Sequence, residues 1–260
     1  MRHYGLIVMN RNNKPRPLRP IVALRALARL IGSRGGDKRQ AMIFIRALEG
    51  ESSRRAFGRF RRTPVGQRLL RDRPRLLDTL IAAEAEDRYP PNTLGYAYRA
   101  FLRHQNMSVA GLMDLAASPL DLPLPEDEAY AEERARVMHD LWHVVTGYDA
   151  GTTGEVCLMA FRCAQVGHLA FRILTLFMLL KPPAHPQKAP IRRAIVEGWR
   201  RGKTAAWLRA ADWEALLPMD LADVRRLLAL TPPENYDRVL ALRTPSAQLY
   251  QPADSAAPAT

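Results

Sequence analysis

The sequence has few of the residues and patterns that define several common protein classes. Its 260 residues include only two cysteines, Cys157 and Cys163. Two are too few for a disulfide framework or for a zinc ribbon built from paired CxxC motifs. Val, Ile and Thr rarely alternate with polar residues, so the pattern typical of half-buried strands is scarce, while Ala, Leu and Arg favour helix. We therefore predict an all-α protein with two reduced thiols in its core.

Acidic residues are scarce in one part of the chain. Residues 1–75 hold 20 Lys and Arg against 4 Asp and Glu, a net charge of +16, whereas the rest of the chain carries −3. Such a basic block suits an anionic lipid surface or nucleic acid. No helix-turn-helix, zinc-finger or aromatic-interleaved RNA motif accompanies it, so no nucleic-acid partner is expected. A solvated arginine-rich surface is the alternative to membrane contact.

The beginning of the sequence lacks the pattern of a cleavable secretory signal. The apolar stretch at residues 5–9 is too short for the hydrophobic region of such a signal. Arginines with few acids are also found in mitochondrial transit peptides, but serine is absent from residues 1–30. Arg outnumbers Lys 34 to 5, which we interpret as the mark of a GC-rich bacterial genome.

We expect one domain with two dissimilar ends. Residues 1–20 are predicted to be an extended basic segment, 21–243 a single multi-helix domain, and 244–260 a disordered tail rich in Pro, Ala and Ser. The domain begins with a basic amphipathic helix at 21–31, which either packs on the protein or lies on a membrane. Its apolar residues at helical spacing are Ile21, Leu24, Leu27, Leu30 and Ile31.

The longest apolar stretch, residues 155–180, approaches the length of a bilayer span. As one helix it would place Arg162, Gln165, His168 and Arg172 in a single polar stripe. Two unpaired arginines inside a bilayer are costly. We therefore predict one long amphipathic helix whose apolar face packs in the core or contacts lipid.

Residues 139–155 read HDLWHVVTGYDAGTTGE and contain the most specific constellation of the chain. A helix predicted over 130–148 places His139, Asp140 and His143 in one sector. The glycine-rich loop that follows can reverse the chain and bring Glu155 back toward them. Two imidazoles with one or two carboxylates suit zinc or a first-row metal such as iron.

Other interpretations of these residues remain open. The histidines could be hydrogen-bonded core residues with Asp140 as their partner. The zincin motif HExxH does not apply because the acid follows the first histidine directly, and GTTGE lacks the ending of a P-loop. An HD-type phosphohydrolase would need a further His and Asp, for which His104 and Asp212 have no supporting spacing.

The pattern His139-Asp140-x-x-His143-x11-Glu155 resembles the signature of the ubiquinone biosynthesis protein COQ-four family, and Arg136 matches the Arg of RxxHD. The likeness covers about residues 20–240. Further matching segments are LLRDRPRLL with Gly66 and Arg68, NTLGYAYRAFL (92–102), Gln165 with Gly167, and EGWRRGKTAAWL…DWEALL (197–217). Met159 and Arg162 depart from the family, which commonly has a Lys and an acid there, and GHLAF replaces GLPM.

The resemblance implies a mostly helical protein of ubiquinone biosynthesis with a metal, zinc in the family, held by His139, Asp140, His143 and Glu155. It implies oxidative decarboxylation of a polyprenylated hydroxybenzoate, in which a hydroxyl replaces the carboxylate at ring carbon one. Asp140 is a candidate catalytic residue, and Arg136 would pair with the substrate carboxylate. Zinc polarises but does not oxidise, so this chemistry favours iron or another redox metal. A non-catalytic, prenyl-lipid-binding scaffold is the alternative.

The resemblance also implies partners and a location. The expected partners are the prenylated quinone precursor, an anionic membrane surface, other quinone-biosynthesis proteins and further copies of the chain. We expect peripheral association with the cytoplasmic face of a bacterial inner membrane, or alternatively with the matrix side of the mitochondrial inner membrane.

Overall fold

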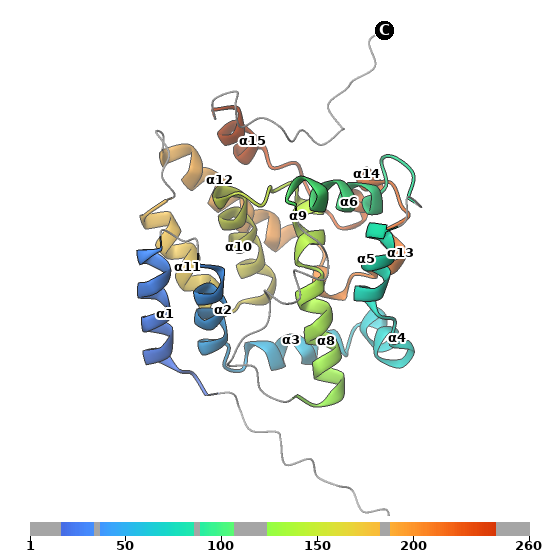
Figure 1. Cartoon of the computed structure of the whole chain (residues 1–260), viewed down its shortest axis with the longest axis horizontal. Coiled ribbons are helices and arrows are strands. Elements are labelled where there is room, and N and C mark those ends of the chain that lie inside the picture. Colours follow the sequence, from blue (N-terminus) through green and yellow to red (C-terminus); the bar gives the residue numbers. More distant parts are fainter. Residues whose placement is uncertain (1–16, 34–36, 86–88, 107–123, 183–187, 243–260) are drawn as a thin grey trace, which may run out of the picture.

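The computed structural model describes residues 17–33, 37–85, 89–106, 124–182 and 188–242 (Figure 1). Within these ranges the backbone forms helices and no strand, with one isolated bridge between Thr93 and Asp220. The all-α prediction is therefore confirmed. Most of the predicted extended segment 1–20 and all of the predicted tail 244–260 lie outside the described residues.

The described residues form a succession of helices. In chain order they are α1 (Pro20–Gly32), α2 (Lys38–Ala47), α3 (Ser52–Phe60), α4 (Pro64–Asp72), α5 (Leu76–Ala85), α6 (Leu94–His104), α8 (Glu126–Val137), α9 (His139–Thr146), α10 (Thr152–Val166), α11 (Leu169–Leu180), α12 (Lys188–Thr204), the 3-10 helix η1 (Leu208–Ala210), α13 (Trp213–Leu216), α14 (Leu221–Leu227) and α15 (Glu234–Ala241).

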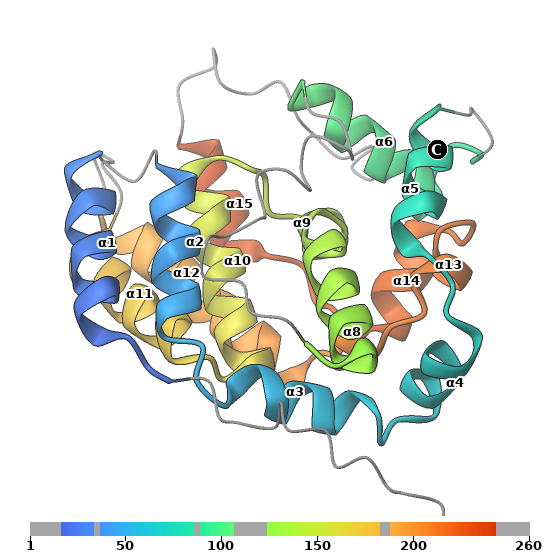
Figure 2. The ribbon, with the colours of Figure 1, turned by 60° about the horizontal axis from the view of Figure 1, so that its bottom comes forward.

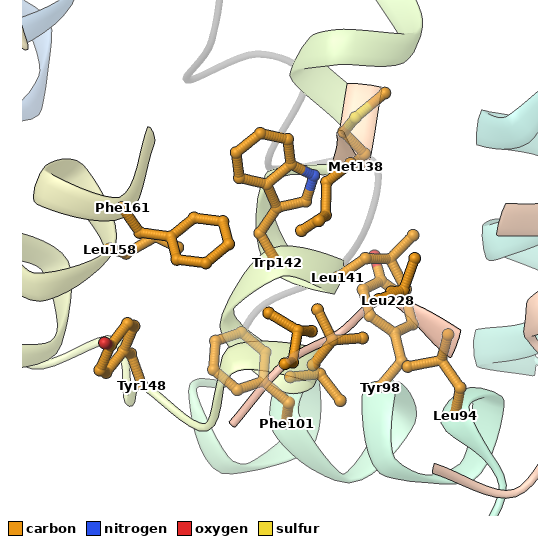
Figure 3. Packing of buried hydrophobic residues seen from close by; sticks show 14 of the residues in the cluster. Leu94, Tyr98, Phe101, Met138, Leu141, Trp142, Tyr148, Leu158, Phe161 and Leu228 are labelled. Carbon is orange, nitrogen blue, oxygen red and sulfur yellow. The ribbon is translucent and has the colours of Figure 1, made fainter. Parts of the chain in front are cut away.

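Two groups of helices flank a central pair. Figure 2 shows α1, α2, α10, α11 and α12 on one side and α4, α5, α6, α13 and α14 on the other, with α8 and α9 between them and α3 running below. Side chains of α9 pack toward both groups (Figure 3). Trp142 meets Phe161 of α10 edge-on at 6.0 Å between ring centroids. Leu141 points toward Tyr98 of α6.

Two glycines let α10 and α12 approach closely. A Cβ atom on Gly198 would lie 2.6 Å from the carbonyl oxygen of Cys157, and one on Gly202 would lie 2.4 Å from that of Phe161. The four-residue spacing of both pairs places them on facing sides of the two helices. Cys157 and Cys163 of α10 are buried and free of disulfide bonds, as predicted.

Local signals in the sequence predict two further features. Residues 63–82 predict two short helices divided at Pro74, and Pro74 does separate α4 from α5. Thr63 begins α4 by accepting a hydrogen bond from Gly66 N at 2.9 Å. Residues 95–105 predict a helix with Tyr98 and Leu102 facing inward, and both side chains are buried in α6.

The prediction of one helix over 155–180 is wrong. Gly167 adopts a left-handed conformation (φ 67°), which ends α10, and the Nδ1 of His168 then accepts a hydrogen bond from Ala170 N to begin α11. The predicted polar stripe is divided as a result. Gln165 and His168 are buried, whereas Arg172 is exposed on α11. Within the described ranges, no helix combines the length and apolarity that crossing a bilayer requires.

The helix predicted over 130–148 is interrupted at Met138. Its backbone (φ −74°, ψ −1°) still donates to Arg134 O, but α8 ends there and α9 begins at His139. Met138 is 2 % exposed and belongs to the central core. The metal motif therefore starts a helix of its own.

The apolar residues predicted for the first amphipathic helix are divided between the two sides of α1. Its buried residues are Ala23, Ala26 and Leu30, which pack with side chains of α2 and α11. Ile21 and Leu24 are instead about two-thirds exposed. Small alanines allow a close approach to the neighbouring helix, and the larger side chains remain outside.

A buried carboxylate in α8 joins three helical elements. Glu132 accepts hydrogen bonds from Ser53 Oγ of α3 at 2.6 Å and from Arg209 Nη2 of η1 at 2.7 Å. Burial alone would raise the pKa of Glu132, but Arg209 and Ser53 outweigh burial and lower it to about 2, from the usual 4.5. The ionised carboxylate therefore stabilises the fold above pH 4.5, and this contribution is lost as pH falls from 4.5 to about 2.

We expect the free energy of unfolding to fall by about 3 kcal/mol over this window because of Glu132. Chemical denaturation at pH 5 and at pH 2 measures the difference. Glu132→Gln lacks the titrating group and should lose less stability over the same window. Equal losses in the two proteins would show that Glu132 does not carry this pH dependence.

Candidate metal centre

Three candidate ligands come from the first two turns of α9. Ligand atoms of His139, Asp140 and His143 all lie within 4.8 Å of one another. Asp140 and His143 are buried, and His139 is partly exposed. The helical spacing that predicted a shared face is therefore present, and the cluster has one side toward solvent.

Glu155 reaches the same place from α10. Its Oε2 lies 3.8 Å from His139 Nε2 and 3.7 Å from His143 Nε2. These separations are too long for hydrogen bonds. They are close to the roughly 3.3 Å that separates two ligand atoms bonded at about 2.0 Å to one tetrahedral ion. One carboxylate oxygen thus faces two imidazole nitrogens across a space of the size that a metal ion needs.

The loop between α9 and α10 brings Glu155 back through two different uses of glycine. Gly147 ends α9 in a left-handed conformation (φ 78°). Gly154 is in α10, and a Cβ atom there would lie 2.0 Å from the carbonyl oxygen of Asp149. Conformational freedom is therefore needed at Gly147, whereas Gly154 permits a close approach.

The second nitrogen of His143 fixes the orientation of its ring. Nδ1 lies 3.0 Å from Tyr148 O, and since a carbonyl can only accept, Nδ1 carries the proton. In the neutral imidazole, Nε2 then presents a lone pair. This atom is buried and has no hydrogen-bond partner among the described residues. A histidine held by a backbone carbonyl with its other nitrogen bare is the arrangement of a metal ligand, so His143 fits a metal ion.

The surroundings of His143 favour positive charge and hold the ring. Burial would lower the pKa of His143, but the Glu155 and Asp140 carboxylates and the Tyr148 carbonyl outweigh it and raise the pKa above its usual value. Phe101 of α6 stacks on the imidazole at 5.4 Å between ring centroids, with an interplanar angle of 21°. A site of negative potential with a clamped ring is suited to a divalent cation.

Arg162 is a site residue whose contact the sequence did not predict. Its Nη1 donates a hydrogen bond to His139 Nδ1 at 3.2 Å. It is on α10, seven residues after Glu155, and this spacing of two helical turns could have indicated a shared face. Burial lowers the pKa of Arg162 to about 10, so the guanidinium remains charged at neutral pH.

The other nominated residues lie in different surroundings. Arg136 is half-buried in the last turn of α8. His104 is exposed near the end of α6, and Asp212 begins α13 and pairs with Arg68. Neither belongs to the cluster of α9. The described residues therefore do not assemble the ligand set of an HD-type phosphohydrolase.

These features define a class: an all-helical protein with a cluster of two imidazoles and two carboxylates from neighbouring helices. The family model described as Coenzyme Q (ubiquinone) biosynthesis protein Coq4 matches residues 53–234, which is more than half of the chain. The protein belongs to this Coq4 family of ubiquinone biosynthesis proteins.

Individual proteins that are similar to this chain carry names from the same family. The chain is 33% identical over 176 residues to the mitochondrial ubiquinone biosynthesis protein coq4 of Pyrenophora tritici-repentis, covering 65% of this chain and 57% of that protein. It is 28% identical over 226 residues to mitochondrial COQ4 of Uncinocarpus reesii, covering 84% and 77%. The chain thus spans little more than half the length of the Pyrenophora relative.

A crystal structure supports the fold. A candidate ubiquinone biosynthesis protein from Nostoc punctiforme PCC 73102 superposes with a TM-score of 0.58 over 82% of this chain and 98% of that one, at 24% sequence identity. This likeness shows a shared helical arrangement.

Proposed function

We propose that the protein is a metal-dependent oxidative decarboxylase of ubiquinone biosynthesis. Its substrate would be a polyprenylated hydroxybenzoate-derived precursor, whose carboxylate at ring carbon one is replaced by a hydroxyl. The observation that carries the proposal is the approach of Glu155 Oε2 to the Nε2 atoms of His139 and His143. Membership of the Coq4 family supplies the pathway.

In this proposal His139, Asp140, His143 and Glu155 hold the ion. A redox metal such as iron would activate dioxygen there, whereas zinc would only polarise the substrate. Tyr148 O and the Phe101 ring keep His143 oriented throughout. Asp140 is buried in the same cluster, and its carboxylate would contribute negative charge to the ion.

The reaction balances with dioxygen and an external two-electron reductant. The bond between the ring and the carboxylate breaks, and carbon dioxide leaves. One atom of dioxygen becomes the new ring hydroxyl. The other becomes water by taking up two protons and two electrons.

The direct test is turnover of a short-chain prenylated hydroxybenzoate by the iron-loaded protein, with dioxygen as oxidant and ascorbate as the two-electron reductant. The proposal predicts carbon dioxide and hydroxylated product in equal amounts. A protein that binds metal and substrate but releases no carbon dioxide would instead be the non-catalytic scaffold.

The scaffold alternative and the proposed membrane association share one structural feature, the outer stripe. We define the outer stripe as the exposed apolar side chains of α1 and α11. Its members are Ile21, Leu24, Ile31, Leu169, Ile173, Leu176 and Leu180. The opposite faces of both helices pack into one cluster with α2. Neither helix contains an acidic residue.

We propose that an anionic bilayer surface covers the outer stripe. Arg25 and Arg29 are exposed on α1, and Arg172 is exposed on α11. Apolar side chains flanked by arginine suit the boundary between acyl chains and anionic headgroups. Peripheral association at the cytoplasmic face of a bacterial inner membrane, or at the matrix side of the mitochondrial one, follows as part of the proposal. Other quinone-biosynthesis proteins and further copies of the chain are proposed as partners.

The double change Leu24→Asp and Leu176→Asp should weaken binding to vesicles that contain phosphatidylglycerol by at least about tenfold. Burial of two leucines would be lost, and two like charges would face the anionic surface. Vesicle flotation measures the bound fraction. Leu227→Asp is the matched control, because Leu227 of α14 is 62% exposed and outside the stripe. Equal binding of the two variants would refute the assignment of this surface.

A further inference from the structure

Arg162 provides a positive charge beside the candidate metal ligands. Its guanidinium donates to His139 and lies 4.7 Å from the centroid of the Phe171 ring of α11. It lies 6.0 Å from the centroid of the Trp142 ring of α9. Glu155 interacts with this charge favourably. The guanidinium thus lies near two aromatic rings and contacts one of the proposed ligands.

The hydrogen bond from Arg162 has a consequence for His139. A guanidinium can only donate, so His139 Nδ1 must accept and carries no proton. Nε2 is then the protonated nitrogen in the neutral ring. A metal ion on Nε2 requires the opposite tautomer, with the proton on Nδ1. Two donors would then face each other, so the contact with Arg162 and a metal ion on His139 Nε2 exclude one another.

We propose that Arg162 forms an anion-binding site for an aromatic carboxylate: it leaves His139 when a metal ion binds, and its guanidinium then pairs with the carboxylate. This inference rests on the proposed function, because the carboxylate is that of the hydroxybenzoate precursor. It assigns the pairing role to Arg162 instead of Arg136.

The surroundings of Arg162 suit this ligand. A guanidinium presents two parallel donors that match a carboxylate, and it is less strongly hydrated than an ammonium group. The rings of Phe171 and Trp142 flank it, so an aromatic acid would find apolar contacts next to the charge.

The first measurement is the affinity of metal-free protein for Zn²⁺, and anaerobically for Fe²⁺, by calorimetry. Arg162→Gln removes the charge, and its amide oxygen can accept from Nδ1–H of His139. We expect metal binding to tighten about tenfold in this variant. The guanidinium no longer repels the ion, and His139 is free to carry its proton on Nδ1. Arg193→Gln changes an exposed arginine of α12, and this variant should bind the metal as the unaltered protein does.

The second measurement is the affinity of the zinc-loaded proteins for 4-hydroxybenzoate and for its neutral analogue 4-hydroxybenzamide. We expect Arg162→Gln to bind the carboxylate about tenfold more weakly and the amide equally well. Arg162→Lys, which keeps the charge but not the paired donors, should lie in between. Circular dichroism checks that each variant is folded.

The outcomes separate this inference from the proposed function. If Arg162→Gln binds 4-hydroxybenzoate as the unaltered protein does, or if Arg136→Gln loses the binding in its place, the anion site is refuted while the metal site stands. If the unaltered protein binds neither Zn²⁺ nor Fe²⁺, the proposed function fails and the anion site fails with it.

Discussion

His143→Ala is expected to abolish turnover and to weaken metal binding by at least about 100-fold. His143 is 1% exposed, its Nδ1 is held by Tyr148 O, and its Nε2 faces Glu155. Alanine removes a ligand that no described neighbour on α9 can replace, since His139 and Asp140 already belong to the cluster. Carbon dioxide release and metal calorimetry measure the two effects.

The control for this variant is His104→Ala. His104 lies near the end of α6 and is exposed, so its loss should change neither quantity. His143→Ala also removes the ring stacked on Phe101, and circular dichroism must show that the helices remain. Full activity in a folded His143→Ala protein would contradict the assignment of the site.

Gly198→Ala is expected to destabilise the fold by about 2–3 kcal/mol. The new Cβ would lie 2.6 Å from the backbone oxygen of Cys157, so α12 must move away from α10. Both helices are extensively packed, and the neighbouring Gly202 makes a similar approach to Phe161. Because α10 carries Glu155, the displacement should weaken metal binding as well. Urea denaturation measures the change in the free energy of unfolding.

Gly58→Ala is the matched control for this effect. Gly58 is in α3, and an added Cβ would meet nothing within 4 Å. Alanine in an open helical position is worth about 0.5–1 kcal/mol relative to glycine, so this variant should be slightly more stable than the unaltered protein. If both alanine variants had the same stability, the close packing of α10 against α12 would not be a source of stability.

The parts of the fold that the sequence predicted depend on local signals. Pro74 interrupts the helix locally, because its ring restricts the preceding residue and its missing N–H removes a helical hydrogen bond. The same holds for the helical spacing of Tyr98 and Leu102, and for that of His139 and His143. These positions needed no knowledge of the rest of the chain.

The features that the sequence did not predict depend on distant contacts. The inward face of α1 is its alanine face because α2 and α11 lie against it, and hydrophobicity alone favours the leucines. Gly167 ends α10, although the apolar residues on both sides of it favour a continuous helix. The spacing of these apolar residues does not indicate the break. The contact of Arg162 with His139 joins α10 to α9 across 23 positions, and α10 packed beside α9 is a property of the fold.

The site was predicted as a set of residue types, and the structure adds their electrostatic relation. Spacing placed His139, Asp140 and His143 together and gave a reason for Glu155 to approach. The proton on His143 Nδ1 follows from a backbone carbonyl five residues away. At His139 the hydrogen bond from Arg162 requires an unprotonated Nδ1, which places the proton of the neutral ring on Nε2. The two histidines are therefore not equivalent, and His143 is the one whose ring orientation suits the proposed metal ion.

The metal content of protein purified without oxygen distinguishes a catalytic ion from a structural one. We expect about one iron or other redox-active ion per chain in the unaltered protein, and none in His143→Ala. Protein that retains only zinc, or that retains the same metal after loss of His143, would contradict a catalytic metal at this site.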